Sequence, residues 1–150
     1  MVRHSDAGDR SRWDGDDRRR PLSEVGRKQA RALVELHAHR PIARLLTSPY
    51  VRCVQTIEPL ATARGLAIEE AHALGEGVAF DVVDRCLRTL SGTDAVVCSH
   101  GDVVGAIVTA LHHRGVDLGG AMTWPKASTW VLDQWPDTTS AVFVDRPPLR

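Results

Sequence analysis

The sequence predicts an α/β fold with a mainly parallel sheet. Short apolar runs alternate with stretches of helical periodicity over most of the 150 residues. The run 95–98 is continuously apolar, which is typical of a strand buried on both faces. Two final runs, 128–133 and 141–145, flank a Pro-Asp turn and predict an antiparallel hairpin at one edge of the sheet.

The first helix is predicted after a polar loop. A short strand ends at the Arg3-His4 pair, and residues 9–22 then carry both charge signs and few apolar side chains. Ser23 is suited to cap a helix, because its hydroxyl can accept a bond from a free backbone N–H. An apolar stripe then runs to about residue 38, and Pro41 stops the helix.

A strand and a second helix are expected next. Residues 43–47 form an apolar run, followed by Ser48 as a cap and Pro49 at the first helical position. Pro59 is expected to kink or end this helix, because its ring removes a backbone hydrogen bond. A short strand over 66–70 follows.

The second half of the chain continues the alternation of strands and helices. Residues 78–90 place apolar side chains on one face of a helix, and Gly101 opens another helix that reaches His113. Three tryptophans in the last third are expected in the core or at its rim, namely Trp124, Trp130 and Trp135. We expect His37 and His39 to be exposed and to face different ways.

Composition limits the classes of partner. The chain is 43% hydrophobic and 25% charged, as expected of one globular domain over residues 1–150. Its net charge of +0 provides no overall field toward nucleic acid or membrane, so neither is expected as a partner. No apolar run approaches the ~20 residues of a membrane span, and the N-terminus lacks an apolar signal region.

The three cysteines suggest a compartment. Cys53, Cys86 and Cys98 lie far apart in apolar contexts. They are expected to be free thiols in a reducing cytoplasm rather than metal ligands. A cytoplasmic location is therefore the expectation.

Three polar stretches follow predicted strands, and each carries a cation or an imidazole. By itself the Arg3-His4 pair favours a surface arginine and a hydrogen-bonded loop histidine. The stretches that contain Arg52 and His100 change this interpretation, because ligands of open α/β sheets gather at the carboxyl ends of strands. Two guanidinium groups and two imidazoles around one volume favour a multiply charged anion, and phosphate is the obvious choice.

These motifs resemble the histidine phosphatase (phosphoglycerate mutase-like) superfamily over nearly the whole chain. The resemblance rests on Arg3-His4, Ser48-Pro49-x-x-Arg52, Ser99-His100-Gly101 and a first-helix signature, Pro21-Leu22-Ser23-x-x-Gly26-x-x-Gln29-Ala30. The short chain is similar to the small SixA-type branch. A closer similarity is to the phosphatase half of MutT-type Nudix fusion hydrolases, through Gly15-Asp16-Asp17, Arg52-Cys53-x-Gln55-Thr56 and Lys126-Ala127-Ser128-Thr129-Trp130. The resemblance implies a three-layer fold with helices flanking the central sheet.

The resemblance also implies a mechanism that needs neither a metal nor another cofactor. His4 attacks phosphorus and forms a phosphohistidine, while a backbone carbonyl holds its other ring nitrogen. Arg3, Arg52 and His100 bind the phosphoryl oxygens and stabilise the transition state. Glu76 lies where the family places its general acid, and Asp6 on the loop beside His4 is the second choice.

Three further stretches have open interpretations. Ser5 stands where Gly or Ala is more usual, and it is a candidate substrate contact whose hydroxyl could reorient His4. Lys126 could contact a distal phosphate or simply be solvated. The loop 9–22 is best explained as a solvated loop, because acidic neighbours balance its run of arginines. In the functional alternative, this loop lines the mouth of a pocket and contacts a polyanionic substrate.

The predicted activity is that of a metal-independent phosphatase acting on a phosphomonoester or on the terminal phosphate of a nucleoside di- or polyphosphate. One alternative is a SixA-like protein phosphohistidine phosphatase, and another is an inactive phosphate-binding module. The expected partners are a phosphorylated nucleotide or a phosphohistidine protein, with a Nudix protein as a possible separate partner. A mutase is the weakest interpretation, because such chains are longer.

The N-terminus departs from the family pattern. Only Met1 and Val2 precede the Arg-His pair, where the family has several apolar residues in its central strand. We therefore expect that the start of this sequence was assigned too late or that the chain was trimmed. We also expect that its short central strand lacks ladder hydrogen bonds.

Overall fold

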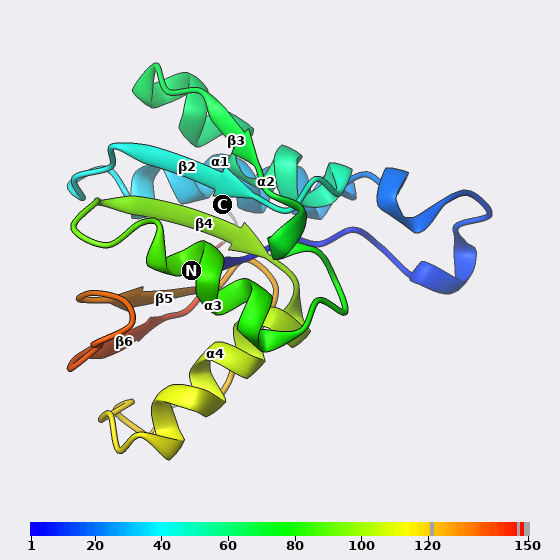
Figure 1. The fold of residues 1–150 in the computed structure, drawn as a ribbon. Helices are drawn as coiled ribbons and strands as arrows, with labels where there is room; N and C mark the ends of the chain where they lie inside the picture. The colour runs from blue at the N-terminus through cyan, green and yellow to red at the C-terminus, as the bar shows by residue number, and fades with distance from the viewer. Residues whose placement is uncertain (121, 147, 149–150) are drawn as a thin grey trace.

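A computed structural model describes residues 1–120, 122–146 and 148, and it shows one six-stranded sheet between two layers of helices (Figure 1). The strand order is β3-β2-β4-β1-β5-β6. The strands are β1 (Val2–Arg3), β2 (Arg44–Thr47), β3 (Ile68–Glu70), β4 (Ala95–Ser99), β5 (Thr129–Leu132) and β6 (Ala141–Val144). The first four are mutually parallel, whereas β5 and β6 form an antiparallel hairpin. The predicted fold class is therefore confirmed.

Among the described residues, four α-helices cover the sheet. They are α1 (Glu24–Leu36), α2 (Val51–Arg64), α3 (Phe80–Arg88) and α4 (Gly101–His113), and three short 3-10 turns lie at Arg10–Arg12, Asp17–Arg19 and His72–Leu74. As predicted, the Ser23 hydroxyl caps α1 by accepting a bond from the Gly26 amide, with 3.0 Å between the atoms. No residue larger than glycine fits at position 26, because a Cβ there would overlap the carbonyl oxygen of Asp6. The start of α1 therefore packs directly on the loop that follows β1.

The second helix corrects the predicted position of its first turn. Helix α2 begins at Val51 rather than at the Ser48-Pro49 pair, and its cap residue, Tyr50, makes no side-chain cap bond. It continues through Pro59 to Arg64, so Pro59 does not end it, and the C-cap residue Gly65 has a φ of +64°. The missing N–H of a proline costs one hydrogen bond, and burial of apolar side chains before and after Pro59 offsets that cost.

Each face of the sheet has its own core. On one face α1 and α2 bury Leu33, Cys53, Ile57 and Leu60 against the strands. On the other, α3 and α4 pack with the hairpin around a second cluster, which includes Val83, Leu87, Val104, Ile107, Leu111 and Trp130. The tryptophan prediction is confirmed, because Trp130 and Trp135 are buried and Trp124 is half-buried.

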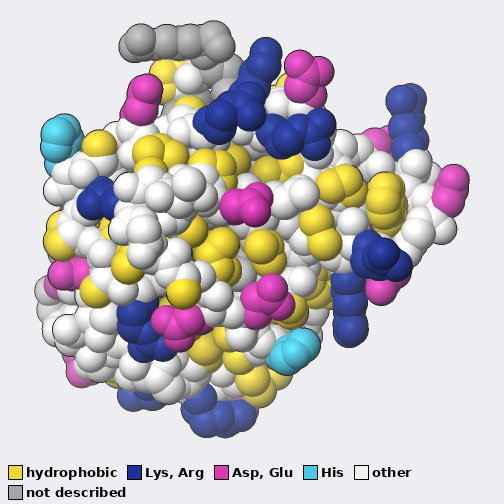
Figure 2. All heavy atoms as spheres, turned by 90° about the horizontal axis from the view of Figure 1, so that it is seen from above, with side chains coloured by type: hydrophobic (Ala, Val, Ile, Leu, Met, Phe, Trp, Pro, Cys, Tyr) yellow, Lys and Arg dark blue, Asp and Glu magenta, His cyan; other side chains and the backbone are white. Residues whose placement is uncertain are grey.

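The molecular surface carries both charge signs. From above, basic and acidic side chains are interspersed with apolar ones rather than gathered into one extended patch (Figure 2). Cys53, Cys86 and Cys98 are free thiols, and Cys86 is the least buried of them. Within the described residues, no helix combines the length and the apolar character that crossing a bilayer requires.

The central strand β1 is short, as expected. It pairs with Cys98 and Ser99 of β4, whereas the start of β4, residues 95–97, pairs with β2 alone in the part of the chain that the structure describes. A cavity of about 600 Å³ lies beyond Met1 between β4 and β5. The Met1 amine reaches into the sheet, 2.7 Å from the carbonyl oxygen of Trp130, and burial lowers its pKa to about 5.

His37 was predicted to be exposed, and this is wrong. It is the C-cap residue of α1 and is only 2% exposed, with Nε2 3.3 Å from the Thr129 hydroxyl at the edge of the cavity. The side chain of a helix-terminal residue can turn under the neighbouring sheet, a direction that helical periodicity does not describe. His39 is exposed, as predicted.

Candidate active site

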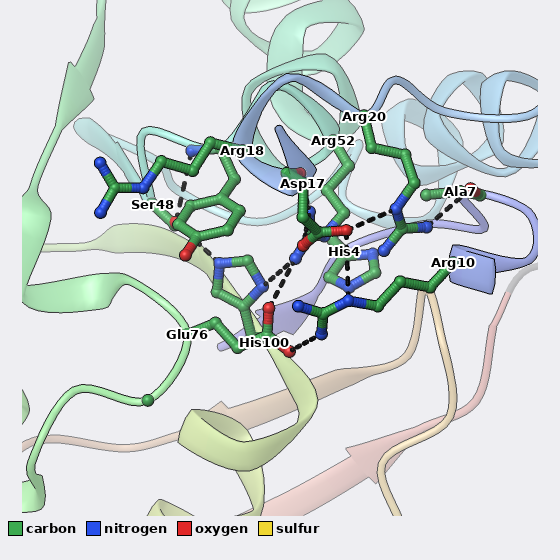
Figure 3. Close-up of polar contacts among 12 residues, drawn as sticks. His4, Ala7, Arg10, Asp17, Arg18, Arg20, Ser48, Arg52, Glu76 and His100 are labelled. Atoms are coloured by element: carbon green, nitrogen blue, oxygen red, sulfur yellow. Dashed lines mark hydrogen bonds and ion pairs between the residues drawn. The ribbon is translucent and has the colours of Figure 1, made fainter. Parts of the chain in front are cut away.

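The predicted residues converge at the carboxyl ends of β1, β2 and β4 (Figure 3). Arg52 Nη2 lies 3.3 Å from His100 Nδ1, and the ring centroids of His4 and His100 are 5.5 Å apart. All three side chains are at least nine-tenths buried. One small anion can therefore contact two imidazoles and a guanidinium at once.

His4 is positioned for nucleophilic attack. Its Nδ1 lies 2.7 Å from the carbonyl oxygen of Ser5, as the expected tautomer requires. The ring then donates its proton to that carbonyl and keeps the lone pair on Nε2. Burial, together with the positive charge of Arg52, lowers the pKa of His4 to about 3. The imidazole is thus neutral at physiological pH, which is the nucleophilic form.

His100 stands at the start of α4, where free backbone N–H groups favour an anion. Its Nε2 lies 2.8 Å from the Ser48 hydroxyl and 3.6 Å from the Cys53 sulfur. The ring of Tyr50 meets it edge-on, with 4.5 Å between centroids. His100 is therefore fixed by the segment between β2 and α2 and by the first turn of α2, and its Nδ1 faces Arg52.

Arg52 is held by two carboxylates. Nη1 lies 3.0 Å from Asp17 Oδ2 and donates to the Asp17 carbonyl at 2.8 Å, while Nη2 pairs with Glu76 Oε2 at 2.9 Å. The guanidinium also lies over the Tyr50 ring, 4.6 Å from its centroid. The sequence predicted Glu76 beside the cationic side chains of the site, and the structure adds a second acidic side chain, Asp17, at Arg52. Asp17 and Tyr50 were missed.

The two candidate acids have different surroundings. Glu76 contacts Arg52, and the next residue, Gly77, donates its N–H to Asp102 Oδ2 at the start of α4, at 2.7 Å.

Asp6, the second candidate acid, accepts bonds from Lys126 Nζ at 2.8 Å and from the Ser23 hydroxyl at 2.6 Å. Burial raises the pKa of Asp6, but these hydrogen bonds outweigh it and lower the pKa to about 2. Asp6 therefore remains ionised, which is unsuitable for a proton donor.

The remaining predicted residues lie around this centre. Arg3 packs against Gly101 and donates to the carbonyl oxygen of Trp124 at 2.9 Å, and its buried Nε has no partner among the described residues. Ser5 is fully buried beneath His4, so its contact with the site is the carbonyl rather than the hydroxyl. Lys126 reaches Asp6 rather than Arg52 or His4.

Comparison with known proteins shows which superfamily and which curated relative the chain is similar to. The family described as the histidine phosphatase superfamily (branch 1) matches residues 1–80. An 8-oxo-(d)GTP phosphatase from Mycolicibacterium smegmatis is 37% identical over 141 residues, which are 88% of this chain and 42% of that protein. This chain thus spans less than half the length of that relative.

Solved structures show the same fold. The protein histidine phosphatase SixA complexed with tungstate aligns with a TM-score of 0.72 and 24% identity, covering 97% of this chain and 93% of that chain. A SixA-named protein from Agrobacterium tumefaciens aligns with a TM-score of 0.73 and 22% identity, covering 96% and 92%. The three-layer architecture expected from the motifs is therefore confirmed.

Proposed function

This chain belongs to the histidine phosphatase superfamily, branch 1, and is a phosphatase; from this premise we propose that it removes the terminal phosphate of a nucleoside di- or polyphosphate through a phosphohistidine at His4. The observation that carries the proposal is the neutral His4 ring, anchored by the Ser5 carbonyl and facing Arg52 and His100. This arrangement supplies a nucleophile and positive charge within one small volume.

The proposed reaction has two steps. In the first, His4 Nε2 attacks phosphorus, the bond to the leaving oxygen breaks, and that oxygen takes a proton from Glu76. In the second, water attacks the phosphohistidine and gives a proton to Glu76, so that inorganic phosphate leaves and neutral His4 is restored. Arg52 and His100 stabilise the charge on the phosphoryl oxygens in both steps. A general acid in this role contributes roughly 10²–10⁴-fold to the rate.

The nucleotide is favoured by two observations. The Mycolicibacterium smegmatis relative is named for an 8-oxo-(d)GTP substrate, although this chain spans only 42% of its length. The loop 9–22 also lies beside the site, where Arg10 Nη1 approaches Glu76 Oε1 at 3.4 Å. An exposed arginine next to the reacting centre is suited to a further phosphate group.

A second candidate is a phosphatase for phosphohistidine on proteins. The observation in its favour is the match to the small SixA fold over nearly the whole of both chains. An identity of 24% shows the fold alone. This candidate therefore serves as a competing outcome of the test below.

A substrate panel tests the proposal. Wild type, His4→Ala and the exposed-histidine control His39→Ala would be assayed with 8-oxo-dGTP, 8-oxo-dGDP, a phosphomonoester and a phosphohistidine carrier domain. We expect turnover of nucleotides, retained in His39→Ala and lost in folded His4→Ala, together with an acid-labile phosphoprotein after rapid quenching. Activity confined to the carrier domain would select the second candidate. Phosphate binding without any turnover would instead identify an inactive phosphate-binding module.

A further inference from the structure

The Arg52 guanidinium, which is suited to bind phosphate, is shared in this structure with the loop 9–22 (Figure 3). Asp17 approaches it twice, through the carbonyl oxygen at 2.8 Å and through Oδ2 at 3.0 Å. Arg52 is 1% exposed and comes from α2, whereas Asp17 begins the second 3-10 turn of the loop. A carboxylate from a distant part of the chain therefore lies where an anionic substrate would meet Nη1.

The Asp17 carboxylate has a second cation already in place. Its Oδ1 accepts a bond from Arg20 Nε at 2.8 Å, and the Arg10 Nε lies 3.6 Å away. Arg20 is itself fixed, because its Nη1 donates to the carbonyl oxygen of Ala7 at 2.7 Å. The Asp17 carboxylate can thus leave Arg52 and still keep a charged hydrogen-bond partner. Exchange of this carboxylate for a substrate anion at Arg52 therefore costs little free energy.

Only some anions can drive this exchange. A phosphoryl oxygen and Asp17 Oδ2 cannot both contact Nη1 closely, because like charges at that distance repel. A terminal phosphoryl group carries two negative charges and outcompetes a carboxylate with one. A phosphodiester carries one charge and gains nothing over the carboxylate that it would displace.

We propose that Asp17 is an internal competitor for Arg52, and that this competition makes the site selective for dianionic terminal phosphoryl groups over monoanionic phosphodiesters. The inference rests on the proposed function, because it assigns Arg52 to the phosphoryl group. It adds a specificity-determining residue to which the sequence motifs assigned no role. It also gives the loop 9–22 a direct part in substrate choice.

Calorimetric binding of two anions tests the competition without requiring turnover. Inorganic phosphate in alkaline buffer is the dianion, and dimethyl phosphate is the monoanion. Asp17→Asn keeps the side-chain shape and an oxygen for Arg20 while removing the charge. We expect it to bind inorganic phosphate about tenfold more tightly, equivalent to ~1.4 kcal/mol. We also expect the affinity for dimethyl phosphate to rise by a larger factor. The preference for inorganic phosphate over dimethyl phosphate should therefore be smaller in this variant than in wild type.

The control is Asp14→Asn, which removes the same charge from the same loop at an exposed residue that makes no ion pair among the described residues. Its affinities for both anions should match wild type. Asp17→Ala, which also deletes the Arg20 contact, should shift in the same direction as Asp17→Asn. Unchanged or weaker phosphate binding in both folded Asp17 variants would overturn the proposal. A protein that shows the expected binding but no phosphatase turnover would contradict the proposed function and leave the competition intact.

Discussion

The Ser48 hydroxyl oxygen lies 2.8 Å from His100 Nε2, while the opposite ring nitrogen, Nδ1, faces Arg52. Ser48 also lies 3.4 Å from the Tyr50 amide nitrogen, from which it accepts a weak bond. Because the Arg52 guanidinium only donates, His100 Nδ1 accepts from it at 3.3 Å, and the ring proton lies on Nε2 and is donated to the Ser48 hydroxyl oxygen. Ser48 thus fixes the His100 tautomer and the orientation in which Nδ1 faces Arg52.

Removing this hydroxyl should impair catalysis. We expect Ser48→Ala to lower kcat by about tenfold, since a hydrogen bond is worth ~1 kcal/mol and the tautomer preference is lost as well. The measurement is steady-state kinetics combined with ¹⁵N NMR of the His100 ring, which reports the tautomer directly. Exposed Ser91→Ala provides the control. A variant with unchanged ring shifts and unchanged kcat would show that Ser48 has no positioning role.

Glu76→Gln and Asp6→Asn should separate the two candidate acids. We expect Glu76→Gln to lower kcat by about 10²–10⁴-fold for a nucleotide or alkyl phosphate, because a poor leaving group needs a proton. The loss should be much smaller for p-nitrophenyl phosphate, whose leaving group departs without one. Asp6→Asn should mainly lower stability, because it weakens the bonds to Lys126 and Ser23. The reverse pattern would assign the acid to Asp6.

Stability should rise with pH in the mildly acidic range. Burial lowers the pKa of His37 to about 4 and that of His4 to about 3, so both rings are neutral in the folded state. The unfolded chain binds these protons below about pH 6.5, and it is therefore favoured as the pH falls from 6.5 toward 4. At ~1.4 kcal/mol per pKa unit, His37 alone accounts for up to about 3 kcal/mol.

Urea unfolding at a series of pH values would measure this effect. We expect His37→Gln to flatten the dependence of the unfolding free energy on pH, whereas His39→Gln at the exposed neighbour should leave it unchanged. Equal slopes in all three proteins would show that His37 binds protons equally in the folded and unfolded states, contrary to the lowered pKa.

Extending the chain ahead of Met1 should stabilise it. Four apolar, β-branched residues joined to Met1 would continue β1 into the cavity between β4 and β5 and replace a buried amine by a peptide group. We expect the melting temperature to rise by about 5 °C or more, since a gain of 1 kcal/mol is worth ~2–4 °C in a chain of this size. New hydrogen-exchange protection should appear at Val97 and Leu132.

A Gly-Ser extension of equal length is the matched control, because it offers backbone bonds without apolar burial. If the apolar extension melted no higher than the original chain, the cavity would not be a place for a strand.

The sequence was informative where structure is local or follows from strand order. The Ser23 cap, the helical stripes and the final hairpin depend on neighbouring residues, and the structure contains each of them. The meeting of His4, Arg52 and His100 follows from parallel strands whose carboxyl ends share one edge. These features need no knowledge of side-chain packing.

Other features depend on tertiary contacts and could not be predicted. Asp17 reaches Arg52 because an irregular loop folds across the site, and such a loop has no periodicity to read. His37 is buried because its ring turns under β5, and α2 survives Pro59 because its flanks pack in the core. In each case the deciding partner lies far away in the sequence.

The position of β1 has a consequence for biosynthesis. This strand precedes its neighbours in the sheet by about a hundred residues, since they lie near residues 98 and 129, and the Ala127 amide donates to the carbonyl oxygens of Arg3 and His4. Such distant pairings make closure slow, because chain entropy is lost before the contacts form. The nucleophile therefore gains its final geometry only after the residues up to β5 have been translated, and a nascent chain stalled before the hairpin would expose an unpaired sheet edge to chaperones.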